Sequence, residues 1–423
     1  MATAPSQELD NAPAQTRPAF LRRVQIRGYK SIAFCDVTLE PLTILVGRNA
    51  SGKSNFLDAL AFLRDVLAKG TVEAVNLHRG RNAILSPQVE GNTTSISIET
   101  DYENPITRTP FRAEYEISVE LPDRNKPVVA CESARILNRT EGSTVGFDRE
   151  GERVEWVGFD DRPPPLDWCP SDRLMLGMYG NTPFLELNLA LHELGIYSFS
   201  PEAIRELQRP TRGIQLEKTG RNLASVIASI QEEDPSVIRR ITAYLAAIVR
   251  DVEHFEVVRY GEYETIRFRL RAVGGSQPVE FDAASMSDGT LRVLSALVAA
   301  SQVQLPGGNG IIGIEEPETS LHPAAMRALV DALDEATLRT QVLLTTHSAE
   351  MLDNSTIKPE NVRVVRMVDG QTTIGPVDEV HFEIVAQKLN SLGGLERENR
   401  LVPDLDDQDR QRALDQELRE TRP

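Results

Sequence analysis

The chain has 423 residues, 40% of them apolar, and carries a formal net charge of −17 with a pI of about 5.0. This length suits one large domain or two ordinary ones, and the acidic balance does not favour a protein that coats nucleic acid, although a local basic groove is compatible with it. Three scattered cysteines indicate neither a disulfide framework nor a metal knuckle, and no apolar run is long enough to span a membrane. We therefore expect a cytoplasmic protein without a membrane partner.

The first 70 residues predict an arm, three strands and a helix. Residues 1–19 are rich in Ala, Pro and Gln, which is typical of a disordered segment. From Phe20, "LRRVQIRGYKSI" alternates as a strand does, and "CDVTLEPLTILVG" predicts two more strands. After the loop "GRNASGKS", one buried helix face is indicated by Phe56, Leu60, Leu63 and Leu67. Gly70 is a favourable residue to end this helix.

The middle of the chain changes pattern twice. Residues 94–157 contain short runs rich in β-branched and aromatic residues with turn residues between them, which predict an antiparallel sheet. A proline-rich connector follows at residues 162–170. From Pro183 to about Arg250 the pattern is helical, and the runs "FEVVRY" and "TIRFRLR" after it predict a strand pair.

The loop at residues 47–54 fits the pattern G-x-x-x-x-G-K-[ST] and predicts a nucleotide site. Glycine lets the backbone curl tightly, and the positive end of the following helix favours phosphate. Lys53 would reach the β- and γ-phosphates, and the Ser54 hydroxyl would bind Mg²⁺. We expect nucleotide contacts from Gly47, Arg48, Asn49, Ala50, Ser51, Gly52, Lys53, Ser54 and Asn55. A chance glycine turn is the alternative, but the predicted strand before the loop and helix after it provide the required context.

The segment "NGIIGIEEPETSLHP", residues 309–323, predicts a buried strand that ends in two acids. Glu315, at the strand end, could hold the magnesium ion, usually through water. Glu316 could orient and polarise an attacking water. Alone, the pair would suggest only an acidic loop after an edge strand, and it is the phosphate-binding loop that favours catalysis.

Two further segments carry candidate residues. In "LLTTHSAEML" a buried strand, Val342 to Leu344, leads to His347, which could donate a hydrogen bond to the γ-phosphate, although a lone histidine is more often structural. The helix between the acidic segment and this strand, residues 323–339, opens with a proline, a favoured first residue. In "SMSDGTLRVLSALVAA" a Ser-Asp-Gly turn opens an apolar helix, with Ser287 or Asp288 as its cap.

Together these motifs resemble those of the ABC-type ATPases in the branch of RecF, the SMC-like heads and the OLD-like proteins, which are AAA family ATPases (AAA_21-like). The loop at 47–54 resembles Walker A, "MSDGT" the signature motif, "IIGIEEPE" Walker B and "ETSLHP" the D-loop. The resemblance covers residues 20–70 and 280–350. It implies the roles assigned to these residues: catalytic Glu316 and the switch residue His347, phosphate-contacting Ser287 and Gly289, metal-binding Ser54 and Glu315, and Lys30 near the nucleotide. Glu315 stands where the family usually has aspartate.

The resemblance implies an α/β fold, a P-loop ABC-type ATPase head with a mixed or parallel core sheet, an antiparallel β lobe and an inserted helical lobe. The expected parts are a disordered arm (1–19), ATPase lobe I (20–182), a helical insert or lobe II (183–275), the half with signature, Walker B, D-loop and H-loop (276–380) and a charged tail (381–423). The family's Q-loop glutamine has two candidates, Gln208 and Gln215.

The implied function is an ATP-binding and ATP-hydrolysing dimeric switch that uses ATP and Mg²⁺ and acts in DNA repair or anti-phage defence. Such a homodimer would control a partner effector protein or clamp nucleic acid. No long coiled coil is visible, and after His347 the acidic pair Asp404 and Asp406 fits a charged helical tail better than a nuclease. The alternatives are an ATP-binding subunit of a transporter and a non-hydrolysing, nucleotide-bound scaffold.

Overall fold

The computed structural model describes residues 19–104, 106–159, 164, 166–181, 183–213, 215–249, 251–271, 278–302 and 310–421. The expected disordered arm therefore lies outside the described residues except for Ala19, and so does part of the proline-rich connector. Within the described ranges, no helix combines the length and the apolar character that crossing a membrane requires.

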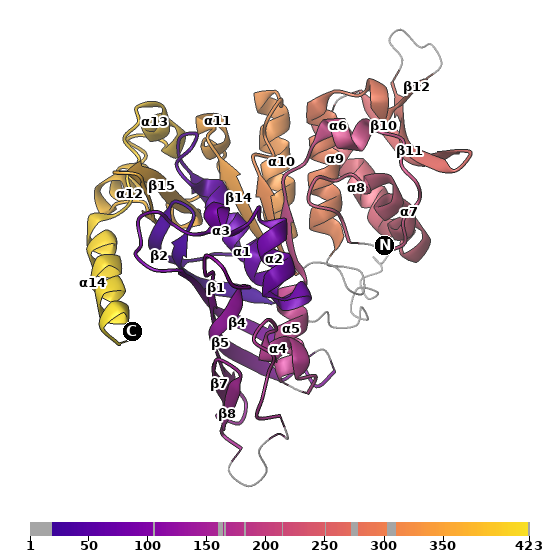
Figure 1. Ribbon diagram of the computed structural model, residues 1–423. Helices are drawn as coiled ribbons and strands as arrows, with labels where there is room; N and C mark the ends of the chain where they lie inside the picture. Colours follow the sequence, from indigo (N-terminus) through magenta and orange to yellow (C-terminus); the bar gives the residue numbers. More distant parts are fainter. Residues whose placement is uncertain are drawn as a thin grey trace, which may run out of the picture.

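A six-stranded sheet forms the centre of the molecule (Figure 1). Its strand order is β16-β15-β3-β14-β13-β9, in which the first five strands from β9 to β15 run parallel and β16 pairs antiparallel with β15. The bounds are β3 Leu42–Val46, β9 Leu194–Tyr197, β13 Ile311–Glu315, β14 Gln341–Thr346, β15 Val362–Val368 and β16 Gln371–Pro376. Strands β3, β9 and β14 are buried along their whole length because both faces of the sheet are covered.

A seven-stranded antiparallel sheet lies beside it, in the order β2-β1-β4-β5-β6-β7-β8. Its strands are β1 Phe20–Tyr29, β2 Ile32–Thr38, β4 Thr93–Glu103, β5 Pro110–Glu120, β6 Val128–Asn138, β7 Thr144–Glu150 and β8 Arg153–Val157. Alternate residues of β4 and β5 are buried, as expected when one face of a sheet meets the core. The antiparallel sheet predicted for residues 94–157 is confirmed, and it also includes β1 and β2.

Two hydrophobic cores lie on the two faces of the six-stranded sheet. Leu45 and Leu343 face the core that contains the first helix and the seven-stranded sheet, whereas Ile44 and Leu344 face the core with the later helices. The helices are α1 Lys53–Lys69, α2 Thr71–Leu77, α3 Arg81–Ile84, α4 Met175–Met178, α5 Phe184–His192, α6 Pro201–Arg205, α7 Leu223–Glu233, α8 Pro235–Ile248, α9 Asp288–Ser301, α10 Pro323–Ala336, α11 Ala349–Leu352, α12 Glu379–Ala386, α13 Leu392–Arg397 and α14 Leu405–Thr421. Figure 1 shows α6 to α9 gathered at one end of the molecule, beside α10.

A small third sheet, in the order β10-β11-β12, lies with this helical group. It comprises β10 Val252–Tyr260, β11 Tyr263–Leu270 and β12 Val279–Asp282. The first two strands confirm the predicted strand pair. The main departure from the sequence prediction is β9, a strand of the central sheet inside the segment expected to be helical. Its four residues, Leu-Gly-Ile-Tyr, follow α5 almost directly and are too few to show a period of their own.

The charged tail forms α14, which packs beside β2 and β16 mainly through polar groups. The Gln411 amide is buried, accepts a hydrogen bond from Asp36 N (3.1 Å) and donates one to Ile374 O (2.9 Å). Arg410 forms an ion pair with the same Asp36 at 2.6 Å. The C-terminal part of the tail is therefore a docked helix.

A buried charged cluster joins β1, α1 and α2. The His78 ring lies between two carboxylates, with Nδ1 3.1 Å from Asp58 Oδ2 and Nε2 3.1 Å from Asp65 Oδ2. The Tyr29 hydroxyl donates to Asp58 Oδ2 at 2.6 Å. Burial opposes the charge on the imidazole, but the two carboxylates outweigh it and raise the pKa of His78.

This cluster predicts a pH-dependent contribution to stability. Because the pKa of His78 is raised in the folded protein, protonation of the ring stabilises the fold. This contribution is complete below pH 6.5, the ordinary pKa of histidine, and is lost as the pH rises through the folded-state pKa. We expect His78→Gln to lower the free energy of unfolding by roughly 1–3 kcal/mol at pH 6 and by less at pH 9, measured by urea denaturation. The exposed His254 provides a control, because His254→Gln should change little at either pH. An equal loss at both pH values would contradict a charged His78.

Candidate functional site

The carboxyl ends of adjacent parallel strands bring the predicted phosphate loop, the two acids and His347 to one edge of the central sheet. Val46 of β3 pairs with Thr346 of β14, Thr345 of β14 with Glu315 of β13, and Ile314 of β13 with Tyr197 of β9. The loop after β3, His347 after β14 and the two acids at the end of β13 are therefore neighbours. This edge is where an open α/β sheet usually binds its ligand.

The phosphate loop, Gly47–Ser54, connects β3 to α1, which begins at Lys53 as predicted. The Lys53 side chain is buried and folded back on the loop, where its Nζ donates to Gly47 O (2.7 Å) and Arg48 O (3.0 Å). Burial lowers the pKa of Lys53, and nearby carboxylates oppose that effect. Four residues of the loop are exposed, namely Arg48, Asn49, Ala50 and Ser54. The exposed part of the loop thus includes the side chains of Arg48, Asn49 and Ser54, whereas the Lys53 side chain is buried.

The β15–β16 hairpin packs against the phosphate loop and supports it. The Thr372 hydroxyl donates to Ser51 O at 2.9 Å and lies 2.6 Å from the Ser31 hydroxyl, to which Asn55 donates at 2.7 Å. A Cβ at Gly47 would lie 2.1 Å from Val365 O. The glycines of the motif are needed here for this close packing as well as for ligand contact. The contact between this hairpin and the loop was not predicted.

Ser54 and Glu315 form the candidate magnesium site. The Ser54 hydroxyl donates to Glu315 Oε2 at 3.2 Å, although the two residues lie on different elements. Burial raises the pKa of Glu315, while the charge of Lys218 and hydrogen bonds from Ser54 and Ser198 oppose that rise. One hydroxyl and one carboxylate suit Mg²⁺, which is commonly held by few protein oxygens together with substrate phosphates. Glutamate reaches Ser54 from the position usually occupied by aspartate.

Glu316 and His347 form the second candidate pair. His347 Nδ1 lies 3.3 Å from Glu316 Oε1, and both side chains are partly exposed. The Glu316 amide donates to Thr345 O at 3.0 Å and Glu316 adopts φ +42°, a conformation that is costly for a residue with a side chain. Such backbone strain often occurs at functional sites. The geometry thus directs this carboxylate towards the histidine at the open edge.

The signature residues Ser287 and Gly289 lie at the start of α9, apart from the phosphate loop. Of the two predicted cap residues, Ser287 caps α9, because its hydroxyl accepts a hydrogen bond from Thr290 N at 3.2 Å. A Cβ at Gly289 would lie 2.7 Å from Ser320 O, so the helix start packs closely on the segment after Glu316. In the ranges that the structure describes, no hydrogen bond or ion pair joins Ser287 to the phosphate loop of its own chain. Ser287 is exposed.

Lys30 does not contact the phosphate loop directly in the described structure. Its Nζ forms an ion pair at 2.6 Å with Asp58, which follows Ser54 by one turn on the same face of α1. Lys218 Nζ lies 3.5 Å from the other oxygen of Asp58. Asp58 was missed, although its helical spacing from Ser54 was visible in the sequence.

Among the residues that the structure describes, no hydrogen bond or ion pair joins either candidate glutamine to the site. Gln208 exchanges backbone hydrogen bonds with Glu264 of β11, and Gln215 accepts one from Asn222 through its carbonyl group. Ser198, directly after β9, is instead the residue that reaches Glu315 from this region. It was missed because β9 was not predicted.

Asp404 and Asp406 do not form a metal site with the structure described. Asp404 Oδ1 accepts a hydrogen bond from Asp407 N at 2.9 Å at the start of α14, and Asp406 is exposed. Among the described residues, no group of three or more His, Cys, Asp or Glu side chains is arranged to hold a metal ion.

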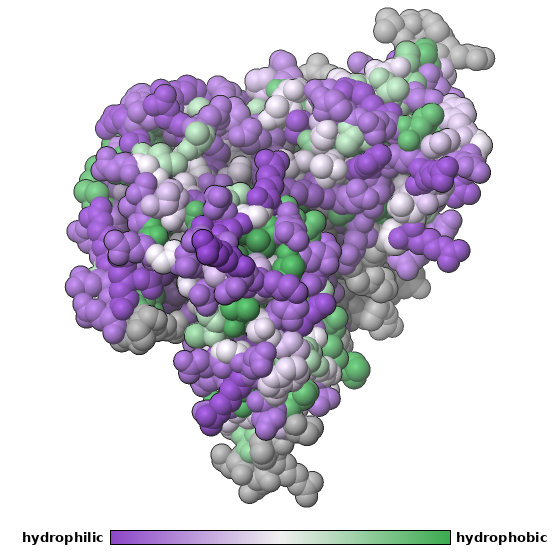
Figure 2. Space-filling view, in the orientation of Figure 1, coloured by the Kyte–Doolittle hydropathy of each residue, from purple (hydrophilic) through white to green (hydrophobic). Residues whose placement is uncertain are grey.

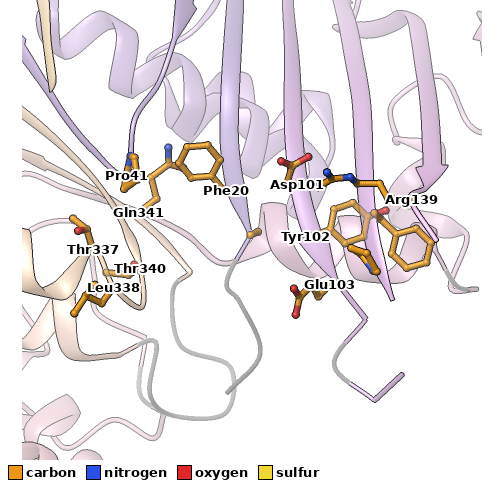
Figure 3. Close-up of a pocket in the computed structure, with 13 residues that line it drawn as sticks. Phe20, Pro41, Asp101, Tyr102, Glu103, Arg139, Thr337, Leu338, Thr340 and Gln341 are labelled. Atoms are coloured by element: carbon orange, nitrogen blue, oxygen red, sulfur yellow. The ribbon is translucent and has the colours of Figure 1, made fainter. Parts of the chain in front are cut away.

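A cavity of about 430 Å³ lies away from the phosphate loop, between the seven-stranded sheet and the α10–β14 turn (Figure 3). Tyr102 and Phe111 stack within it at a centroid distance of 5.4 Å. None of the predicted site residues lines this cavity.

Hydrophilic residues dominate the face seen in Figure 2, so exposed apolar surface does not single out a functional region there.

Comparisons with known proteins show which family and fold this chain resembles. A family model described as "AAA domain, putative AbiEii toxin, Type IV TA system" matches residues 42–353. A search of curated proteins found no match. Among solved structures, an SMC head bound to the C-winged helix domain of ScpA has a TM-score of 0.52 at 12% identity, covering 86% of this chain and 99% of that chain.

Two other SMC heads match with lower scores. One has an extended coiled coil and is bound to the C-terminal domain of ScpA derived from Pyrococcus furiosus (TM-score 0.48, 13% identity, 88% of this chain and 100% of that chain). The other is from Thermotoga maritima (TM-score 0.41, 15% identity, 85% and 99%). At such identities these likenesses concern the fold alone. The expected fold class, a P-loop ABC-type ATPase head, is confirmed.

The packing of the phosphate loop predicts a specific cost for losing Gly52. Gly52 has φ +103°, and a Cβ there would lie 2.0 Å from Thr372 Oγ1. Gly91 has a similar φ of +107° with nothing within 4 Å. We expect Gly91→Ala to cost only the backbone strain, about 1–2 kcal/mol, and Gly52→Ala to cost roughly 1–3 kcal/mol more because Thr372 must move. Urea unfolding of both variants measures the difference, and equal losses would show that Thr372 does not constrain the loop.

Proposed function

This chain belongs to the AAA domain family whose model matches residues 42–353, and from that premise we propose that it is an ATP-binding and ATP-hydrolysing dimeric switch. The observation that carries the proposal is the meeting of three pairs at one sheet edge. These are Lys53 with its loop, Ser54 with Glu315, and Glu316 with His347.

The residues divide the work of phosphoryl transfer. The loop amides and Lys53 would bind the phosphates. The Lys53 ammonium would then exchange its hydrogen bonds to the carbonyls of Gly47 and Arg48 for contacts with the phosphates. Ser54 and Glu315 would hold Mg²⁺, which would supply charge neutralisation on the phosphate oxygens. Glu316 accepts a proton from the attacking water, and His347 donates a hydrogen bond to the γ-phosphate. Lys30 acts from a distance through its pair with Asp58, close to the metal site.

The signature motif acts across a homodimer in this proposal. Ser287 is exposed and has no contact with its own phosphate loop among the described residues, so its helix start is available to a nucleotide held by a second copy. Gly289 supports it by packing against Ser320. ATP bound between Lys53 of one copy and Ser287 of the other would favour the closed dimer, and hydrolysis would release it.

The output is proposed to pass through a partner protein in anti-phage defence or DNA repair. The family description includes a toxin of a type IV TA system, which supports defence over repair. An SMC head of similar fold is bound to a winged helix domain of ScpA, which supports a protein partner. The charge of −17 disfavours broad contact with a nucleic-acid backbone, so nucleic acid would be restricted to a local groove.

In this proposal the chain is organised in the parts predicted from the sequence, 20–182, 183–275, 276–380 and 381–423, and the partner docks on the helical part or on the tail.

Two other functions can be distinguished from this one by simple measurements. An ATP-binding subunit of a transporter would associate with membranes, and a scaffold with bound nucleotide would release no phosphate from ATP.

The first prediction of this proposal concerns the two acids. We expect Glu316→Gln to bind ATP normally and to hydrolyse it about 10²–10⁴ times more slowly, because it keeps the shape but loses the charge that accepts the proton. Glu315→Gln should weaken magnesium-dependent ATP binding instead. Glu350→Gln, an exposed acid on α11, is the control and should leave turnover unchanged. Phosphate release and ATP titration measure these effects, and wild-type turnover in Glu316→Gln would refute the assignment.

The second prediction concerns the composite site. We expect Lys53→Ala to abolish ATP binding, and Ser287→Arg to keep it while blocking closure of the dimer through a bulky cation at the start of α9. Each variant alone should be inactive. A mixed dimer has one intact site, made of Lys53 from one chain and Ser287 from the other, so mixing should restore part of the ATPase activity. If differently tagged chains co-purify as mixed dimers and stay inactive, the sites are not shared between copies.

A further inference from the structure

A third carboxylate of the acidic turn, Glu315–Leu321, has no role in the proposed mechanism. Glu318 is only 4% exposed, and burial raises the pKa of its side chain. One of its oxygens, Oε1, accepts a hydrogen bond from the Thr346 hydroxyl, and the other, Oε2, is buried without a hydrogen-bond partner. A buried acid is costly to keep and calls for an explanation.

The partner of Glu318 occupies a central position at the site. Thr346 is the last residue of β14, directly before His347. Its hydroxyl also accepts a hydrogen bond from Ser348 N at 2.9 Å, and its carbonyl accepts one from Gly47 N at 3.4 Å. Thr346 therefore contacts the phosphate loop, the segment of the switch histidine and the acidic turn at once.

We propose that Glu318 is a positioning residue of the ATPase site, which ties the end of β14 to the acidic turn through Thr346 and so holds His347 and Glu316 in register. The pair to be held is the 3.3 Å contact between His347 Nδ1 and Glu316 Oε1, whose two residues lie on adjacent strands. Glu316 cannot be held by packing alone, because it is partly exposed and has a positive φ. A buried hydrogen bond two residues further along the turn supplies the missing constraint. The inference rests on the proposed ATPase function.

Glu318 also contributes its charge to the phosphate site. The negative charges of Glu316, Glu318 and Glu396 oppose the effect of burial on the pKa of Lys53 and help to keep that ammonium protonated. The positioning role needs only an oxygen that accepts from Thr346. Glutamine provides such an oxygen and leucine does not, so the two substitutions separate the hydrogen bond from the side-chain volume.

The test compares Thr346→Val, Glu318→Leu, their double variant and Glu318→Gln with the wild-type protein. We expect Thr346→Val and Glu318→Leu each to lower kcat at least tenfold with the Kd for ATP changed less than about twofold. The double variant should be no slower than the slower single one, because both remove the same bond. Glu318→Gln should keep kcat within about threefold of wild type. Thr43→Val is the matched control, since it removes a buried hydroxyl at the opposite end of the adjacent strand β3.

A second measurement needs no ATPase activity. Amide hydrogen exchange at Ser348 in nucleotide-free protein should be at least tenfold faster in Glu318→Leu than in wild type, and close to wild type in Glu318→Gln. An inactive wild-type protein would refute the proposed function and leave this readout to judge the positioning role. Wild-type kcat in Thr346→Val, unchanged exchange in a folded Glu318→Leu, or a Glu318→Gln as inactive as Glu316→Gln would overturn the proposal. If Glu318→Leu does not fold, Thr346→Val and Glu318→Gln still test the proposal.

Discussion

The parallel register of β3, β14 and β13 is the constraint on which the candidate site depends. Successive residues of a strand point to opposite faces, so a slip of one residue would exchange the two buried faces of a strand. Ile44 and Leu344 face one core while Leu45 and Leu343 face the other, and neither face can be given to solvent. The packing of each side chain in its own core thus fixes the register of the strands, and the register sets the distances between the phosphate loop, Glu316 and His347.

Charge at this edge is concentrated in a small space. The carboxylates of Glu316, Glu318 and Glu396 oppose the effect of burial on the pKa of Lys53. Burial also raises the pKa of Glu318 and of Glu396. Like charges repel one another at this edge, and the Lys53 ammonium donates hydrogen bonds to the carbonyls of Gly47 and Arg48. Bound nucleotide with its cation would add both signs of charge at once. An acidic protein would in this way be able to hold a phosphate chain.

Much of this arrangement could be predicted from the sequence, because the motifs carry their own structural context. The strand before Gly47, the helix from Lys53 and the strand ends at Glu315 and before His347 all appear as expected. The failures share a cause. Strand β9 is four residues long, and the contacts of Ser198 and Thr372 join segments far apart in the chain. Local periodicity reports which face of an element is buried, but not which distant element covers it.

The support of the phosphate loop has a consequence for how the protein is made. The bond from Thr372 to Ser51 spans 321 positions of the sequence, and the strand next to β3 in the sheet, β14, also comes from the last fifth of the chain. During synthesis the phosphate loop leaves the ribosome long before the hairpin that packs against it. A chain cut short before β16 would carry the full motif without the structure that holds it. The phosphate loop therefore gains this support only after the hairpin has been synthesised.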